Sequence, residues 1–160
     1  MAARRVVITG LGVISPVGNT VSEAWDSILN GRSGIGPVTR FDASALSARI
    51  AGEVKGFDVG AYISAKEARR MDTFIHFGLA AGIQAIRDSG IEVTDANSDR
   101  IGVNIGSGIG GLPMIEQTHQ EYREKGPRRI SPFFVPASII NMISGHVSIR
   151  YGYKGPNLAI

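Results

Sequence analysis

The stretch from Met71 to Ile86 constrains the fold of this chain more than any other part of the sequence. Its spacing suits a helix, and its apolar residues lie nearly all the way round that helix: Phe74, Ile75, Phe77, Leu79, Ala80, Ile83 and Ala85. A helix that is apolar on every side is buried in a sizeable protein. Ser89 and Gly90 end the pattern. We therefore expect this helix to be buried and to pack against a sheet.

Three short apolar runs are the expected strands of that sheet. They run from Arg5 to Thr9, from Ile101 to Ile105 and onward from Asn157, and such runs are typical of buried strands. Four helical patterns lie between them. Two begin at the capping boxes of Thr20 and Ser64, a third runs from Leu112 to Lys125, and a fourth begins at Ala137 within the apolar stretch 133–149. Residues 32–61 are expected to form loops and short extended pieces. Strands that alternate with helices indicate an α/β layer architecture.

The size and composition indicate one globular unit over residues 1–160. Hydrophobic residues make up 43% and charged residues 19% of the chain, which is typical of a folded domain. There is no cysteine, which excludes disulfides, a thiolate nucleophile and cysteine-bound metal within these residues. No apolar stretch suits a signal peptide or a membrane span, so we expect a cytoplasmic protein. Because the chain ends inside an apolar strand, we expect it to be truncated.

A glycine-rich run, Gly106 to Gly111, lies between the second strand and the helix that follows it. Gly106, Gly108 and Gly111 match the G-x-G-x-x-G pattern, in which a helix N-terminus and free amides hold a pyrophosphate. A dinucleotide site also needs a second strand with an acidic residue about 20 positions on, and residues 126–132 are neither strand-like nor acidic. We therefore favour a tight structural turn. A third interpretation is that these glycines let a substrate or another backbone approach closely.

The three histidines, His76, His119 and His146, indicate no metal site, because none stands at a metal-ligand spacing. His76 lies within the apolar helix and is expected to be a core residue with satisfied hydrogen bonds. No serine-hydrolase motif occurs either.

Basic residues gather in two places, at Lys66, Arg69 and Arg70 and again at Arg128 and Arg129. Each group is either a solvated face or a docking surface toward which long-range attraction steers an acidic partner. The net charge of +3 is mild, so only this clustering gives charge a role. Few aromatic residues flank the two groups, so a stacking platform for nucleic acid is not indicated.

Several of these stretches together resemble one family, the elongating β-ketoacyl-acyl carrier protein synthases of bacterial fatty acid synthesis. The similar stretches are 6–12 with 15–18, 70–72, the glycine-rich run 106–111, and 155–156. The most specific is 126–136, which residues 141–142 and 145–146 extend. The resemblance covers all 160 residues and is strongest to the synthase II branch, through Ile109 and the Phe133-Phe134 pair.

The resemblance implies a thiolase-like, layered α-β-α-β-α fold, of which this chain is most of the N-terminal half. It also implies a homodimer in which a cysteine accepts an acyl chain from acyl carrier protein. Two histidines then help to decarboxylate malonyl-acyl carrier protein for a Claisen condensation. In the family these residues lie beyond the position of Ile160, so no catalytic residue is expected within 1–160. No cofactor and no metal are implied, because the substrates arrive on the phosphopantetheine arm of the carrier protein.

Two sets of site residues follow from the resemblance. Gly108, Ile109, Phe133 and Phe134 would line the acyl pocket, with Phe134 contributed across the dimer. Lys66, Arg69, Arg70, Arg128 and Arg129 would form the rim on which the acidic carrier protein docks. Two alternatives stay open: a chain-length factor or similar relative without the nucleophile, and a non-catalytic fragment that binds carrier protein or dimerises. Residues 1–160 alone are expected to be inactive and poorly soluble.

Overall fold

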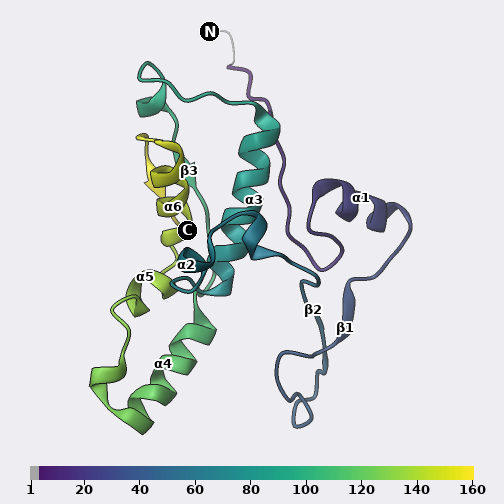
Figure 1. Ribbon diagram of the computed structural model, residues 1–160. Coiled ribbons are helices and arrows are strands. Elements are labelled where there is room, and N and C mark those ends of the chain that lie inside the picture. Colours follow the sequence, from purple (N-terminus) through teal and green to yellow (C-terminus); the bar gives the residue numbers. More distant parts are fainter. Residues whose placement is uncertain (1–3) are drawn as a thin grey trace.

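Helix α3, Thr73–Ser89, lies at the centre of the computed structural model, which describes residues 4–160 (Figure 1). Residues 1–3, the start of the N-terminal run, lie outside the described residues. The Asp72 side chain caps the first turn of α3, and Gly90 ends the helix in the left-handed conformation with a φ of 63°. The side chains of Ile75, Leu79, Ala80 and Ile83 are buried. The prediction of a buried helix is confirmed.

Strands β3, Val103–Asn104, and β4, Asn157–Leu158, form a parallel pair that shares its core with α3. Helix α6, Met142–Tyr151, packs against both strands and against α3. One buried cluster joins these elements, and it contains Ile63, Met71, Ile75, Leu79, Val103, Ile143, Val147 and Tyr153. Helices packed on a parallel pair of strands agree with the α/β architecture predicted from the sequence.

The run from Arg5 to Thr9 is not part of a sheet in this structure, and that part of the strand prediction is wrong. Residues 4–14 form no strand or bridge, and the Val6 side chain is 92% exposed. The backbone instead runs beside α3, where the Leu11 N–H donates to the Asp88 carboxylate at 2.8 Å. Polar side chains of α3 therefore accept hydrogen bonds that a neighbouring strand would otherwise accept.

Helix α1, Val21–Leu29, begins at Thr20, whose hydroxyl accepts a hydrogen bond from the Glu23 N–H at 3.2 Å. The Glu23 carboxylate accepts from the Asn19 N–H rather than from Thr20, so the predicted capping box is half formed. The apolar residues of this helix are exposed: Val21, Trp25, Ile28 and Leu29. An antiparallel hairpin of β1, Ile35–Pro37, and β2, Ile50–Gly52, follows, as expected for short extended pieces.

The remaining elements are short, apart from α4, Leu112–Lys125, which has the bounds predicted from the sequence. Helix α2, Ala65–Ala68, opens with the complete capping box of Ser64 and Glu67. Three 3₁₀ turns are η1, Val59–Ala61, η2, Ser98–Arg100, and η3, Pro127–Arg129. Among residues 4–160, no helix has both the length and the apolar character needed to cross a membrane.

The apolar stretch 133–149 forms two helices rather than the one expected from Ala137. Helix α5, Phe134–Ser138, ends four residues before α6 begins. The Ser138 hydroxyl donates to the Phe134 carbonyl at 2.8 Å, and the Ser138 carbonyl accepts from the Gly111 N–H at 2.9 Å. The bond to Gly111 comes from a distant part of the chain, so the local pattern could not reveal this break.

Helices α3 and α6 approach each other closely because Gly78 has no side chain. A Cβ atom at Gly78 would lie 2.6 Å from Cδ1 and 2.7 Å from Cγ2 of Ile143, a buried residue of α6. One turn further along α3, a Cβ atom at Gly82 would lie 3.5 Å from Cγ2 of Val147, which is an ordinary contact. The packing of α3 against α6 therefore requires a glycine at position 78 but not at position 82.

We predict that Gly78→Ala destabilises the protein while Gly82→Ala does not. Overpacking a tight core costs about 1–3 kcal/mol, whereas alanine in a helix interior is favoured over glycine by roughly 0.5–1 kcal/mol. Chemical unfolding of both variants measures the difference. Equal effects of the two substitutions would show that Ile143 yields freely and that the close approach is unimportant.

Candidate functional site

The glycine-rich turn between β3 and α4 is built around a close backbone approach. Gly110 has a φ of 86°, in the region that favours glycine, and a Cβ there would collide with the Ser138 carbonyl oxygen. A Cβ at Gly111 would lie 2.8 Å from the Cα of Ser138. Of the three interpretations of the motif, the approach of another backbone is the one that the structure supports, and that backbone belongs to α5.

The amides at the start of α4 leave no cradle for a pyrophosphate. The Leu112 N–H donates to Gly110 at 3.0 Å, the Ile115 N–H donates to Gly111 at 3.0 Å, and the Met114 N–H donates to the Asp72 carboxylate at 2.8 Å. Pro113 has no N–H to offer. Protein acceptors therefore occupy every first-turn donor after Gly111, which speaks against a dinucleotide site.

The predicted acyl-pocket residues are brought near one another but do not line a common cavity in the part of the chain that the structure describes. Ile109 is 68% exposed, and a Cβ at Gly108 would contact nothing within 4 Å. Phe133 is 39% exposed and Phe134 is half-buried at the start of α5. The turn and α5 are joined through the Gly111–Ser138 bond. The common pocket stays a prediction.

The predicted docking residues are all exposed. Lys66 and Arg69 lie on or directly after α2, where the Arg69 Nε–H donates to the Ala65 carbonyl at 3.1 Å. Arg128 and Arg129 lie in η3, which packs against α4. Within residues 4–160 the one ion pair joins Arg32 and Asp26. The predicted rim therefore consists of cations without a carboxylate partner.

Arg70 differs from the other basic residues, and sequence reasoning missed this. Its guanidinium carbon lies 4.3 Å from the centre of the Phe133 ring, within the range of a cation–π contact. A pocket of about 270 Å³ lies beside this pair, and its walls also include Arg69, Glu121 and Ser131. Arg70, which was predicted to dock the carrier protein, thus contacts Phe133, which was predicted to line the acyl pocket. No spacing in the sequence signals this pairing, since 63 positions separate the two residues.

A cleft of about 1000 Å³ lies between the β1–β2 hairpin and the helices α3 and α4. Phe77, Ile50 and Leu112 supply apolar wall, and Arg40 and Glu53 stand among the lining residues. This cleft was not predicted from the sequence, because residues 32–61 carry no pattern that specifies where the hairpin lies relative to the helices.

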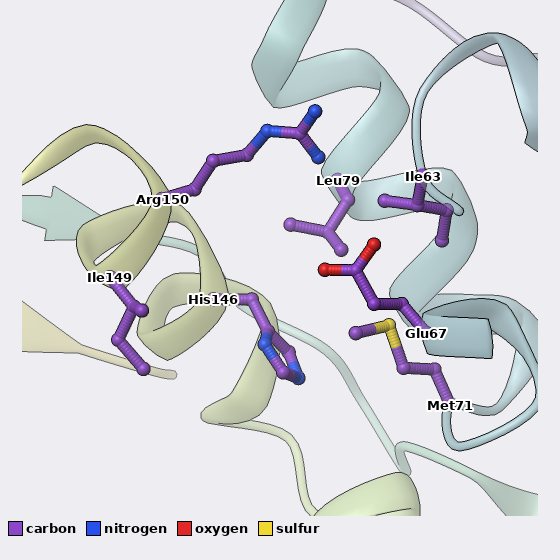
Figure 2. Close-up of a pocket in the computed structure, with 7 residues that line it drawn as sticks. All are labelled: Ile63, Glu67, Met71, Leu79, His146, Ile149 and Arg150. Carbon is purple, nitrogen blue, oxygen red and sulfur yellow. The ribbon is translucent and has the colours of Figure 1, made fainter.

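A second cavity, of about 200 Å³, gathers three titratable side chains above an apolar floor. In Figure 2, Glu67 of α2 points toward the space between His146 and Arg150 of α6, with Leu79 and Met71 beside it. Burial lowers the pKa of His146, and the nearby Glu67 carboxylate partly opposes this shift. Hydrogen bonds from Ser64 hold the pKa of Glu67 below its usual value, with smaller contributions from Arg150 and His146.

Of the other two histidines, His76 was predicted to have satisfied hydrogen bonds, and this is confirmed. His76 Nε2 lies 3.0 Å from the Ala68 carbonyl oxygen, within hydrogen-bond distance, so it is a satisfied, partly buried residue. His119 is exposed on α4. No group of three or more metal-ligating side chains gathers anywhere in residues 4–160.

We predict that His146 makes the protein less stable in mild acid. Because its pKa is lowered in the folded state, the unfolded state binds the proton first, and stability falls as pH drops below about 6.5. His146→Gln should therefore lose less unfolding free energy than the wild type between about pH 6.5 and 5. His119→Gln is the matched control, because it removes a histidine from an exposed position of α4. Denaturant unfolding at both pH values measures the effect, and identical pH dependence in all three proteins would contradict it.

The whole chain is similar in sequence to known proteins. Residues 3–160 match the family described as Beta-ketoacyl synthase, N-terminal domain. The chain is 59% identical over 160 residues to 3-oxoacyl-[acyl-carrier-protein] synthase 2 of Vibrio cholerae and 57% identical to the protein of the same name from Vibrio harveyi. In both cases all of this chain is covered but only 39% of the relative.

Solved ketosynthase structures share the fold. The ishigamide ketosynthase/chain length factor matches 99% of this chain and 39% of its own, with a TM-score of 0.79 and 30% identity. A type II PKS acyl-carrier protein in complex with its ketosynthase, bound to the hexaketide, matches 95% of this chain and 40% of its own, with a TM-score of 0.77 and 26% identity. The fold is therefore the thiolase-like α/β fold predicted from the resemblance.

The match over residues 3–160 and the identity to the Vibrio proteins lead to one conclusion: this chain belongs to the β-ketoacyl synthase family.

Proposed function

We propose that this chain is the N-terminal part of a 3-oxoacyl-[acyl-carrier-protein] synthase II that elongates fatty acyl chains. The observation that carries the proposal is the meeting of Arg69, Arg70 and Phe133 around one pocket. Two cations that could face a charged carrier protein thus adjoin an aromatic residue suited to an acyl chain. The 59% identity to the Vibrio cholerae synthase supports it.

The reaction joins an acyl group to the two-carbon unit left when malonyl-acyl carrier protein loses carbon dioxide. An enzyme thiolate first attacks the acyl thioester on the carrier protein, so that the acyl chain passes to the enzyme sulfur and the phosphopantetheine thiolate of the carrier leaves. The enolate formed by decarboxylation then attacks the thioester carbonyl carbon, and the thiolate leaves. Residues 1–160 hold no cysteine, so a longer chain must supply the nucleophile. These 160 residues would contribute scaffold, pocket wall and docking surface.

The five cations suit an acidic carrier protein as docking partner. They are exposed and have no carboxylate partner among residues 4–160. They would therefore raise the association rate of the carrier protein rather than its affinity once bound, and arginine can hold a carboxylate through two hydrogen bonds. The ketosynthase of the polyketide complex, which is 26% identical to this chain, is bound to its acyl-carrier protein. We assign direct docking to Lys66, Arg69, Arg128 and Arg129, and an indirect part to Arg70, because it is engaged with Phe133.

The proposal also covers the oligomeric state, the cellular location and the cofactor requirement of the protein. A cytoplasmic homodimer is the form that the family resemblance implies, with Phe134 reaching the acyl pocket across the dimer. The exposed side chains of Phe133 and Val135 beside it offer apolar surface for such a contact. The enzyme would need no cofactor of its own, because its substrates arrive on the carrier protein, and it would have no nucleic-acid partner.

The second candidate function is that of a chain-length factor, which lacks the nucleophile. The similarity to the ishigamide ketosynthase/chain length factor supports this candidate. Both candidates would dock a carrier protein. Formation of 3-ketoacyl product by the full-length protein separates them.

We predict that Ile109→Phe in the full-length protein blocks long acyl primers more than short ones. Added bulk in a packed pocket costs about 1–3 kcal/mol, which corresponds to roughly one to two decades in rate. Steady-state kinetics with primers of increasing length measure it. If Ile109 only fills core space, all primers will be slowed alike and the pocket assignment is wrong.

We predict that Lys66→Glu with Arg69→Glu raises KM for carrier-protein substrates by roughly three- to tenfold, since exposed ion pairs each contribute about 0.2–1 kcal/mol. The value of kcat and the turnover of small thioester analogues should stay nearly unchanged. Added salt should weaken the wild type toward the variant. Lys154→Glu with Arg100→Glu, which reverses two exposed cations outside the predicted rim, is the charge-matched control. Equal losses with carrier-protein and small substrates would mean that these residues are structural.

A further inference from the structure

Asp72 is a buried acidic residue for which the sequence assigned no role. Its side chain is nearly inaccessible, with 5% of the residue exposed. One carboxylate oxygen, Oδ1, accepts from the Phe74 N–H at 3.4 Å and so caps α3. The other, Oδ2, accepts from the Met114 N–H at 2.8 Å in the first turn of α4. A single carboxylate thus joins the positive ends of two helices.

Helix α4 has no side-chain cap of its own. The residue at its N-cap is Gly111, which offers no side chain, and no local side chain bonds to the first turn. The Met114 N–H is one of the orphan donors that every helix N-terminus leaves. Asp72, 42 positions away, is the acceptor that satisfies it. The start of α4 is therefore held by tertiary structure.

Asp72 also fixes the position of α5 relative to that start. Its own backbone N–H donates to the Ala137 carbonyl at 3.3 Å. The next residue of α5, Ser138, accepts from the Gly111 N–H at 2.9 Å. A Cβ at Gly111 would lie 3.1 Å from the Cβ of Asp72, so this glycine is wedged between Asp72 and α5.

Ile109 depends on this anchor because little else holds it. Its side chain is 68% exposed, and the neighbouring Gly108 has open space beside its Cα. Between β3 and Ile109, the last backbone hydrogen bond is the one that the Ser107 N–H donates to the Ile160 carbonyl at 3.1 Å. On the helix side, the turn is fixed at Gly111 and Met114.

We propose that Asp72 is a positioning residue for the turn that carries Ile109, and that it sets the distance between this turn and α5. The inference rests on the proposed function in so far as Ile109 gates an acyl pocket. Asp72 touches neither substrate nor reacting atoms in this scheme. It acts through the Met114 N–H and the Ala137 carbonyl.

The decisive variant is Asp72→Ser in the full-length protein. Serine is as good an N-cap as aspartate, so the cap of α3 is kept, but its shorter side chain cannot also reach Met114. Asp72→Asn keeps one acceptor oxygen of the same reach for the Met114 N–H, but its amide nitrogen, which cannot accept, replaces the oxygen on the Phe74 N–H. It is therefore the complementary variant, which keeps the bond to α4 and gives up the cap of α3. Thr20→Ala removes the N-cap of α1, far from the turn in sequence, and is the matched control for a general loss of helix capping.

Two readouts are needed. Hydrogen exchange over residues 107–114 should become faster in Asp72→Ser, and the ratio of kcat/KM for long against short acyl primers should change on the order of tenfold. Asp72→Asn, which keeps the bond to α4, should leave both close to their wild-type values. Thr20→Ala should speed exchange in α1 and leave the primer ratio unchanged.

The outcomes separate this inference from the proposed function. Unchanged exchange over residues 107–114 in Asp72→Ser overturns the positioning role. So does an altered primer ratio in Thr20→Ala that equals the one in Asp72→Ser, because general destabilisation would then explain both. If exchange responds to Asp72→Ser but neither that variant nor Ile109→Phe alters the primer ratio, the positioning role stands and the acyl-pocket assignment fails.

Discussion

The close approach of α3 to α6 is the constraint on which the rest of the structure depends. Gly78 presents no side chain to Ile143, so the two helices pack without a gap and bury Leu79 and Val147 in one core with β3. Strands β3 and β4 and helix α5 pack against α6. The glycine-rich turn leaves β3 toward the end of α5, and α2 brings its cations to the start of α3 (Figure 1). Because packed interiors tolerate little change in volume, the site inherits its geometry from this contact.

Charge at the surface is divided between two tasks. Lys66, Arg69, Arg128 and Arg129 are exposed and unpaired among the described residues, which suits attraction of an acidic partner in water. Arg70 is held against an aromatic ring instead. Docking of a carrier protein and the geometry of the acyl pocket would thereby be connected through the Arg70 guanidinium.

Local signals in the sequence were reliable where the responsible interaction is local. The Ser64–Glu67 capping box forms as predicted, because both partners lie within one turn of α2. Helix α4 ends at Lys125 as predicted, since Gly126 follows it with a φ of 79°. Predictions were wrong where the outcome depends on distant partners. The run 5–9 has a strand-like pattern but no strand partner within residues 4–160, and α5 stops because Ser138 bonds to Gly111.

The sequence by itself determined where α1, α3 and α4 form, which helix is buried and which family the chain resembles. Apolar periodicity, caps and short motifs are encoded within a few positions. The tertiary structure alone decided that Arg70 lies over Phe133, that Glu67 faces His146, and that Asp72 caps α4. These contacts join residues 42 to 79 positions apart. No local pattern specifies them, because they exist only once the core has brought the helices together.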